Sequence, residues 1–167
     1  MQLLLVQHGV AVNEEVDPRR PLSDAGRHEV ERVARCLAAA AESALRWPIA
    51  EIRHSGKPRA EQTALILAKA LPRAPRVDQS DQLAPNEDLE PLLKELARRA
   101  EENTTLVIVG HLPHLARLAG KLIVGREDRR PINFVNAGIA ALSYGGSDGW
   151  AVDWMLTPAI SPPLSTR

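Results

Sequence analysis

Two short apolar runs constrain the fold of this chain more than any other feature. They lie within residues 2–7 and 104–109, and both are rich in Leu, Val and Ile without alternating polar positions. Runs of this length and composition are typical of strands that are buried on both faces, as in parallel sheets covered by helices. The first run leads into His8-Gly9 and the second into Gly110-His111.

The segments between and after these runs alternate between helical and strand patterns. Apolar residues recur at helical spacing in four segments, which we expect to be helices: residues 24–45 after the capping residue Ser23, residues 58–71, residues 89–96 and residues 112–124. Short extended patterns predict the remaining strands at residues 49–53, 76–78, 137–144 and 150–156.

This alternation predicts an α/β fold, a three-layer α/β/α sandwich around a mostly parallel central sheet. The last two strands flank the turn signal at residues 145–149 and are expected to form a terminal hairpin with an antiparallel strand. Trp150 and Trp154 share strand periodicity and are expected to cover one sheet face. We expect a single domain over residues 1–157 and an irregular tail over residues 158–167.

Length and composition exclude several classes of protein. A chain of 167 residues is expected to form one compact domain with an ample core. Its 21 basic and 21 acidic residues cancel, which argues against a nucleic-acid-binding protein, and no apolar run is long enough for a membrane span or a signal peptide. The single cysteine, Cys36, cannot form an intrachain disulfide or a zinc cluster. A soluble, cytoplasmic protein is expected.

Three segments of the predicted sheet deliver polar groups to one edge. In parallel sheets, ligands bind beyond the carboxyl ends of the strands, and we expect residues 7–9, 55–59 and 110–111 to meet there. A histidine after a strand is an ordinary structural feature. The combination of two histidines, His8 and His111, with Arg59 at the start of a helix is more specific, and arginine is suited to binding a small anionic substrate through phosphate or carboxylate groups.

The same segments carry a resemblance that spans nearly the whole chain. Five motifs in order resemble the histidine phosphatase superfamily, the phosphoglycerate mutase-like fold, and within it the SixA-type phosphohistidine phosphatases. They are residues 5–9, residues 20–23 with Gly26, residues 54–64, residues 83–86 and residues 109–113.

This resemblance implies a covalent mechanism with three catalytic residues. His8 would attack phosphorus and form a phosphohistidine, Arg59 would neutralise the phosphoryl oxygens, and His111, if protonated, would add a second cation. The residues around them would bind the phosphoryl group: Gln7, Gly9, Arg20 and Ser55. Gly9 would leave space for this group to approach the backbone. Ser55 either binds phosphate or caps the following helix. No metal or cofactor is implied.

Two departures from the family pattern leave the function open. Gln7 stands where the family carries an arginine, so the protein is either an active phosphatase or a weak enzyme that mainly binds phosphate or a phosphoprotein. The carboxylic acid that phosphomonoesterases use to protonate an alkoxide has no clear equivalent, although Asp81, Glu87 and Asp88 lie in the relevant stretch.

We therefore expect a metal-independent phosphatase that acts on protein phosphohistidine, with a histidine-phosphorylated protein or another phosphorylated substrate as its partner. A small-molecule phosphomonoesterase is the further alternative. The sequence does not indicate an oligomeric state.

Three other histidines are expected to lie outside this chemistry. His28 is predicted to face solvent on its helix. His54 is either a structural residue at the end of its strand or part of the pocket. His114 follows His111 at a spacing that fits metal ligands, but the absence of a nearby acidic or cysteine partner argues against a metal site.

Overall fold

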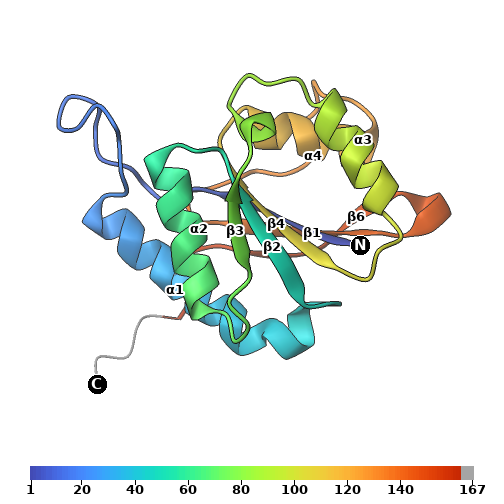
Figure 1. Ribbon diagram of the computed structural model, residues 1–167, viewed down its shortest axis with the longest axis horizontal. Coiled ribbons are helices and arrows are strands. Elements are labelled where there is room, and N and C mark those ends of the chain that lie inside the picture. Colours follow the sequence, from blue (N-terminus) through green and yellow to red (C-terminus); the bar gives the residue numbers. More distant parts are fainter. Residues whose placement is uncertain (163–167) are drawn as a thin grey trace.

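A six-stranded sheet with helices on both faces forms the computed structural model, which describes residues 1–162 (Figure 1). The strands are β1 (Gln2–Gln7), β2 (Ile49–His54), β3 (Arg76–Gln79), β4 (Thr105–Gly110), β5 (Ile139–Tyr144) and β6 (Trp150–Leu156). The helices are α1 (Asp24–Ala44), α2 (Pro58–Ala70), α3 (Glu90–Arg99) and α4 (His114–Val124), with short 3-10 turns η1 (Asp81–Leu83) and η2 (Gly146–Asp148). The predicted three-layer α/β/α class is confirmed.

The strand order, β3-β2-β4-β1-β5-β6, brings the two apolar runs together at the centre of the sheet. Strands β1 and β4 pair in parallel, with Leu5 beside Ile108, and β2 joins β4 and β3 in the same direction. Strand β5 runs antiparallel to β1, and β6 runs antiparallel to β5. The carboxyl ends of β1, β2 and β4 therefore share one edge, as the sequence predicts.

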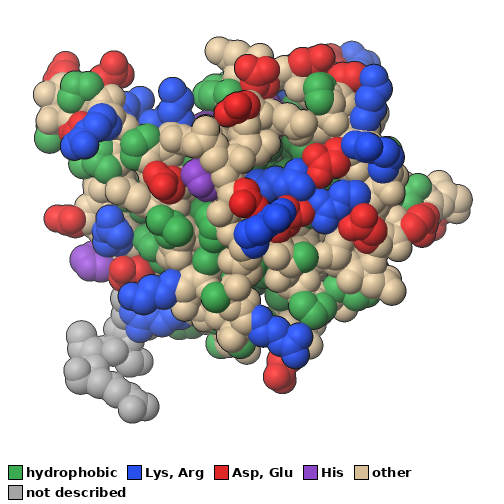
Figure 2. All heavy atoms as spheres, viewed as in Figure 1, with side chains coloured by type: hydrophobic (Ala, Val, Ile, Leu, Met, Phe, Trp, Pro, Cys, Tyr) green, Lys and Arg blue, Asp and Glu red, His purple; other side chains and the backbone are tan. Residues whose placement is uncertain are grey.

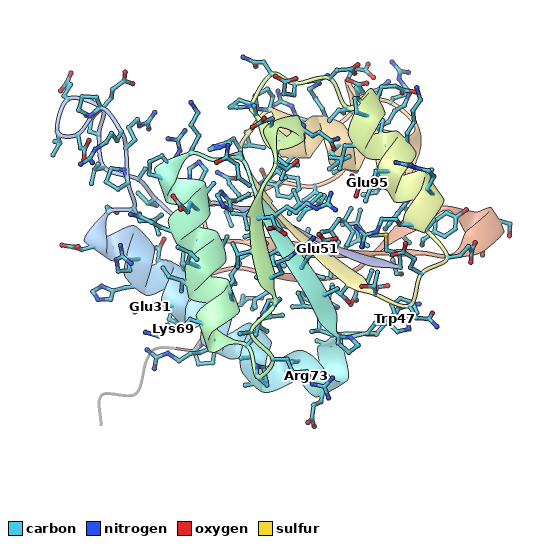
Figure 3. All side chains as sticks on the ribbon, in the orientation of Figure 1. Glu31, Trp47, Glu51, Lys69, Arg73 and Glu95 are labelled. Carbon is cyan, nitrogen blue, oxygen red and sulfur yellow. The ribbon has the colours of Figure 1, made fainter. Side chains whose placement is uncertain are left out.

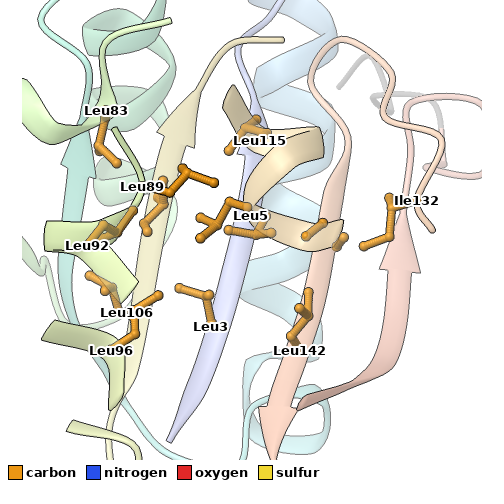
Figure 4. Packing of buried hydrophobic residues seen from close by; sticks show 14 of the residues in the cluster. Leu3, Leu5, Leu83, Leu89, Leu92, Leu96, Leu106, Leu115, Ile132 and Leu142 are labelled. Atoms are coloured by element: carbon orange, nitrogen blue, oxygen red, sulfur yellow. The ribbon is translucent and has the colours of Figure 1, made fainter. Parts of the chain in front are cut away.

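Each face of the sheet has its own apolar core. Helices α1 and α2 cover one face, where Leu4, Val6 and Val107 pack against Val33 and Leu67. Helices α3 and α4 cover the opposite face, and Figure 4 shows the leucines that fill it. These include Leu3, Leu5, Leu92, Leu96, Leu106 and Leu115. Successive residues of β1 enter opposite cores, which explains the lack of polar alternation in its sequence.

The helices begin where local chemistry favours it. The side chain of Ser23 accepts a hydrogen bond from the N–H of Gly26 and caps α1, and Pro58 occupies the first position of α2. Helix α4 begins at His114, two residues later than expected, because Pro113 takes the capping position.

One strand expectation is wrong. The hairpin β5–β6 forms as predicted, but its register shifts between Ala141 and Leu142. A bulge of this kind inserts one residue and reverses which face the following side chains occupy. Trp150 therefore packs in the α3–α4 core, whereas Trp154 packs in the α1–α2 core.

The end of the chain lies against α1. Residues 157–162 form turns without helix or strand, and a guanidinium nitrogen of Arg32 donates to the carbonyl of Pro158 at 2.9 Å. The remainder of the expected tail, residues 163–167, lies outside the described residues. None of the four helices has the length and apolar character needed to cross a bilayer, as far as residues 1–162 are concerned.

A largely buried ion network joins β2 to α3 at the far side from α1. Glu51 accepts hydrogen bonds from Arg53 and Arg99, and Arg53 also reaches Glu95. Figure 3 shows Glu51 and Glu95 on these neighbouring elements, and Figure 2 shows basic and acidic side chains interleaved over the same region. This network ties helix α3 to the sheet by charge as well as by its leucines.

Candidate active site

Two hydrogen bonds fix the ring of His8 just beyond the end of β1. Its Nδ1 lies 2.7 Å from the carbonyl oxygen of Gly9, and its Nε2 lies 3.1 Å from Nε of Arg59. An arginine Nε–H only donates, so Nε2 of His8 must accept and the ring proton must reside on Nδ1. The lone pair of His8 is therefore on Nε2, the nitrogen that faces Arg59.

The backbone of His8 is held as firmly as its ring. Its N–H donates to the carbonyl of Gly110 at 3.2 Å, which links the ends of β1 and β4. Its carbonyl accepts from the N–H of Ala137 at 3.2 Å and from Nδ2 of Asn136 at 2.9 Å. Asn136 is a residue that the sequence did not single out. It binds a backbone atom of a residue 128 positions away in the sequence, and no local sequence pattern predicts such a contact.

The environment of His8 keeps its imidazole neutral. Burial lowers its pKa first, and the charges on Arg59 and Arg20 lower it further, while the hydrogen bond to Gly9 acts in the opposite direction. A neutral imidazole with a fixed lone pair is a competent nucleophile near neutral pH.

Thr63 connects Arg59 to the backbone beside His8. Its hydroxyl donates to the carbonyl of Arg59 at 2.7 Å and accepts from the N–H of Gly9 at 3.1 Å, and the side chain is completely buried. Thr63 lies within the motif of residues 54–64, but no role was predicted for it from the sequence. A polar residue on the otherwise apolar face of α2, beside Ala60 and Ala64, is the sequence feature that could have indicated one.

The expected role of Gly9 is wrong. A Cβ at this position would lie 2.6 Å from Cγ2 of Val30 and 3.0 Å from the carbonyl oxygen of Gly26, so the missing side chain faces α1 and not a phosphoryl group. The N–H of Gly9 is also already bound to Thr63. Glycine is required here because the strand end and the first turn of α1 pack in direct contact.

His111 lies beside His8 and forms a buried pair with Ser55. The two histidine ring centroids are 4.8 Å apart, and Oγ of Ser55 lies 2.5 Å from Nε2 of His111. Burial, followed by repulsion from a protonated His8 and from the charges of Arg59 and Lys57, lowers the pKa of His111 to about 3. The expected second cation is therefore a neutral ring at pH 7.

Ser55 does not cap the following helix. The capping position of α2 is Lys57, whose side chain makes no capping hydrogen bond, while the hydroxyl of Ser55 is engaged by His111. The expectation of a cap is wrong. Ser55 instead orients a ring next to the predicted nucleophile, and Nδ1 of His111 is buried without a hydrogen-bond partner among residues 1–162.

Arg20 and Gln7 occupy different positions relative to this centre. Arg20 adopts a left-handed backbone conformation (φ 52°) in the loop after β1. Burial lowers the pKa of both His8 and Arg59, and the charge of Arg20 lowers both further. Gln7 ends β1 with its side-chain oxygen buried and, within the described part of the chain, unpaired. The guanidinium groups of Arg59 and Arg20 thus both lie close enough to His8 to oppose its protonation.

The remaining candidates lie outside the centre. His28 is exposed, as expected. His54 is buried, and its Nδ1 accepts from the N–H of Gly56, which supports the structural role. His114 is fully buried in the first turn of α4. Within residues 1–162, no group of three or more His, Cys, Asp or Glu side chains could hold a metal ion.

The three candidate acids are exposed, and two of them bind local structure. Asp88 accepts from the N–H of Glu90 at the start of α3, and Asp81 accepts from Gln79. Glu87 is also exposed. Among the described residues, no carboxylate hydrogen-bonds to His8 or Arg59.

Comparison with solved structures identifies the fold. The protein histidine phosphatase SixA complexed with tungstate superimposes with a TM-score of 0.80 at 24% identity, covering 95% of this chain and 98% of that one. Bacillus stearothermophilus YhfR gives 0.65 at 18% identity, covering 91% and 95%. Mycobacterial glucosyl-3-phosphoglycerate phosphatase with VO3 gives 0.69 at 17%, covering 92% and 97%. No protein-family model and no curated protein sequence matches the chain.

Proposed function

We propose that this chain, which has the fold of the histidine phosphatases, removes phosphate from histidine side chains of a protein through a phosphohistidine intermediate on His8. The observation that carries the proposal is the fixed tautomer of His8. Its Nδ1–H is held by Gly9 and its Nε2 lone pair faces Arg59. The likeness to SixA supports the same reaction.

In the first step, Nε2 of His8 attacks the phosphorus of a substrate phosphohistidine in line with the P–N bond that breaks. The Nε–H of Arg59 shifts its hydrogen bond from His8 to the equatorial phosphoryl oxygens, where negative charge concentrates. Nδ1–H of His111 donates to the same group if Ser55 donates its hydroxyl proton to Nε2. Arg20 supplies the second fixed charge.

The substrate leaves as an imidazole. When its second ring nitrogen is protonated, breaking the P–N bond releases a neutral ring, and no further acid is needed. An alkoxide leaving group requires a proton donor. Because Asp81 and Asp88 serve local structure, the site favours phosphohistidine over alkyl phosphates.

In the second step, water attacks the phosphorus of phosphorylated His8. The P–Nε2 bond breaks and inorganic phosphate leaves. The phosphorylated ring retains the proton on Nδ1 and is cationic, and the carbonyl of Gly9 stabilises that charge. His8 is thus the leaving group of this step and is regenerated as a neutral imidazole, just as the substrate ring was released in the first step.

A second candidate function rests on Gln7. With its side-chain oxygen buried and unpaired in the described residues, it replaces a fixed charge by a neutral amide, and the protein would bind phosphate or a phosphoprotein with little turnover. The two candidates share a corollary, since Gln7→Arg is expected to tighten binding of inorganic phosphate. Unchanged affinity would mean that residue 7 does not face the phosphate.

The test is phosphate release from a histidine-phosphorylated protein, with an alkyl phosphate in parallel. Wild type is expected to hydrolyse the phosphohistidine, to turn over the ester poorly and to accumulate an acid-labile phosphoenzyme after rapid quenching. His8→Ala should lose all three signals, whereas the matched control His28→Ala, at an exposed position, should keep them. A chelator in the assay tests the expected independence of metal ions.

Each other outcome points to a defined alternative. Phosphate binding without turnover by wild type would favour the binding module. Efficient hydrolysis of the alkyl ester would favour a small-molecule phosphomonoesterase. Full activity of His8→Ala would refute the covalent mechanism.

A further inference from the structure

A groove between α1 and α2 leads away from the candidate site along the outer face of the molecule. It has a volume of about 520 Å³. Its walls come from α1, with Arg27, Glu31 and Arg35, and from α2, with Gln62, Leu65, Ile66 and Lys69. Figure 1 shows that both helices run from the edge of the sheet that carries His8 toward the opposite end, and the residues that line the groove follow them in that direction.

The upper end of the groove lies close to Arg59 along α2. Gln62 lies one helical turn after Arg59, and its side-chain oxygen accepts the N–H of Leu22 at 2.7 Å. Leu22 follows the loop that carries Arg20. From Arg59 to Lys69, ten residues at 1.5 Å per residue give a length of about 15 Å, so a partner lying in the groove can present a phosphorylated side chain to His8.

The charges of the groove are unbalanced. Arg27, Arg35 and Lys69 face one carboxylate, Glu31, and none of the three cations forms an ion pair within residues 1–162. The chain as a whole has no net charge, so this excess is local. Figure 2 shows Lys and Arg side chains over the lower part of these helices, with Asp and Glu side chains beside them, and Figure 3 labels Lys69 and Glu31, which line the groove from α2 and α1.

The floor of the groove is apolar. Leu65, which lines the groove, is 50% exposed, and Ile66 beside it in the sequence is only partly buried. Two helices lying side by side offer a valley that accepts a third helix, whose diameter with side chains is about 10 Å. Arg27 and Arg35, eight residues apart on one face of α1, would meet acidic side chains about 12 Å apart on that helix.

We propose that this groove docks an acidic amphipathic helix of the histidine-phosphorylated substrate protein; the proposal rests on the proposed function. The apolar face of the partner helix covers Leu65 and Ile66, its carboxylates pair with Arg27, Arg35 and Lys69, and its phosphohistidine reaches the site past Gln62. The groove thereby selects a protein substrate, whereas the site itself recognises only the phosphoryl group.

Two synthetic helical peptides test this proposal. Both are alanine-based and carry one histidine near the end and leucines at i and i+4; one has glutamates on the flanking positions and the other has glutamines. Affinity is measured by fluorescence anisotropy with the unphosphorylated peptides, independently of catalysis. Wild type is expected to bind the acidic peptide about tenfold more tightly in low salt, and this preference should vanish in high salt.

Charge reversal identifies the surface. Arg35→Glu with Lys69→Glu is expected to remove or invert the tenfold preference, and the matched control Arg98→Glu, an exposed cation on α3 across the sheet, is expected to retain it. Leu65→Ala should weaken both peptides equally. Equal binding of the two peptides by wild type, or a preference that survives the double reversal, would overturn the docking proposal.

Phosphorylated peptides and free phosphoramidate separate this proposal from the proposed function. If the groove acts on substrate choice, the ratio of kcat/KM for the acidic and neutral phosphopeptides follows the binding ratio and falls to about one in the double reversal. Turnover of phosphoramidate and both peptides at similar rates would refute the docking proposal and leave the proposed function intact. Failure to hydrolyse any of the three would refute the proposed function, while the anisotropy result would still decide the docking surface.

Discussion

Nε of Arg59 donates directly to Nε2 of His8, the nitrogen that carries the lone pair. The group expected to bind the phosphoryl oxygens thus also holds the nucleophile in place before substrate arrives. In the proposed mechanism, the phosphoryl group takes over this hydrogen bond while its phosphorus moves toward the nitrogen that is freed. The proposed nucleophile and the proposed phosphate ligand would then act as a single unit, which Thr63 ties to the backbone.

Replacing Arg59 by glutamine is expected to raise the pKa of His8. The guanidinium charge opposes protonation of the ring, so its removal favours the imidazolium. The same variant should lower kcat/KM on phosphohistidine by roughly 100-fold or more, as for other lost charge-stabilising donors. A ¹⁵N NMR titration of the histidine rings measures the first effect. Arg73→Gln, at the opposite end of the sheet, should change neither quantity, and an unaltered His8 titration in Arg59→Gln would contradict the pairing.

Removing the hydroxyl of Ser55 is expected to impair orientation of His111. In Ser55→Ala the ring loses its partner at Nε2, and kcat should fall about tenfold with a smaller change in KM. Ser55→Thr keeps the hydroxyl and should recover most of the activity. The ¹⁵N shifts of His111 report its tautomer and should differ from wild type in Ser55→Ala alone. An unchanged tautomer in that variant would show that Ser55 only fills space.

Sequence patterns predicted the fold and the meeting of His8, Arg59 and His111 at one sheet edge, for physical reasons. Buried parallel strands have a continuous apolar signature, and parallel strands bring their carboxyl ends together. His8, Arg59 and His111 therefore could be placed at one sheet edge before the structure was known.

The residues that hold these groups were harder to foresee. Thr63 and Asn136 bind backbone atoms of segments far away in the chain, and such contacts leave no sequence period. The neutral state of His111 depends on burial between charged neighbours. The bulge in β5–β6, which sends Trp150 and Trp154 to opposite faces, depends on pairing geometry.

Gly9→Ala is expected to destabilise the fold. The added Cβ would meet Val30 at 2.6 Å and the carbonyl of Gly26 at 3.0 Å, and forced repacking of this kind costs about 1–3 kcal/mol. Chemical denaturation measures the loss. Gly145→Ala is the matched control, because its Cβ would meet only contacts of 3.6 Å, and it should be nearly neutral. Combining Gly9→Ala with Val30→Ala should recover only part of the loss, since the backbone of Gly26 remains.

The buried carboxylate of Glu51 is expected to make the stability of the fold pH-dependent. Burial alone would raise its pKa, but hydrogen bonds from Arg99 and Arg53 outweigh this and lower the pKa below its ordinary value of 4.5. The unfolded chain then binds the proton more tightly than the folded one, so the contribution is full above pH 4.5 and is lost as pH falls through the lowered folded-state pKa. Breaking a buried pair from one side costs about 3–5 kcal/mol. Glu51→Gln should therefore unfold more easily than wild type at pH 7 by an amount of this order, and the two free energies of unfolding should converge as the solution is acidified.

Glu102→Gln is the matched control, because it removes a half-exposed partner of the same Arg99, and it should cost less than about 1 kcal/mol. Denaturant titrations of the three proteins between pH 7 and pH 3 measure these differences, and a gap between Glu51→Gln and wild type that stays constant with pH would show that the ionised carboxylate is not its source.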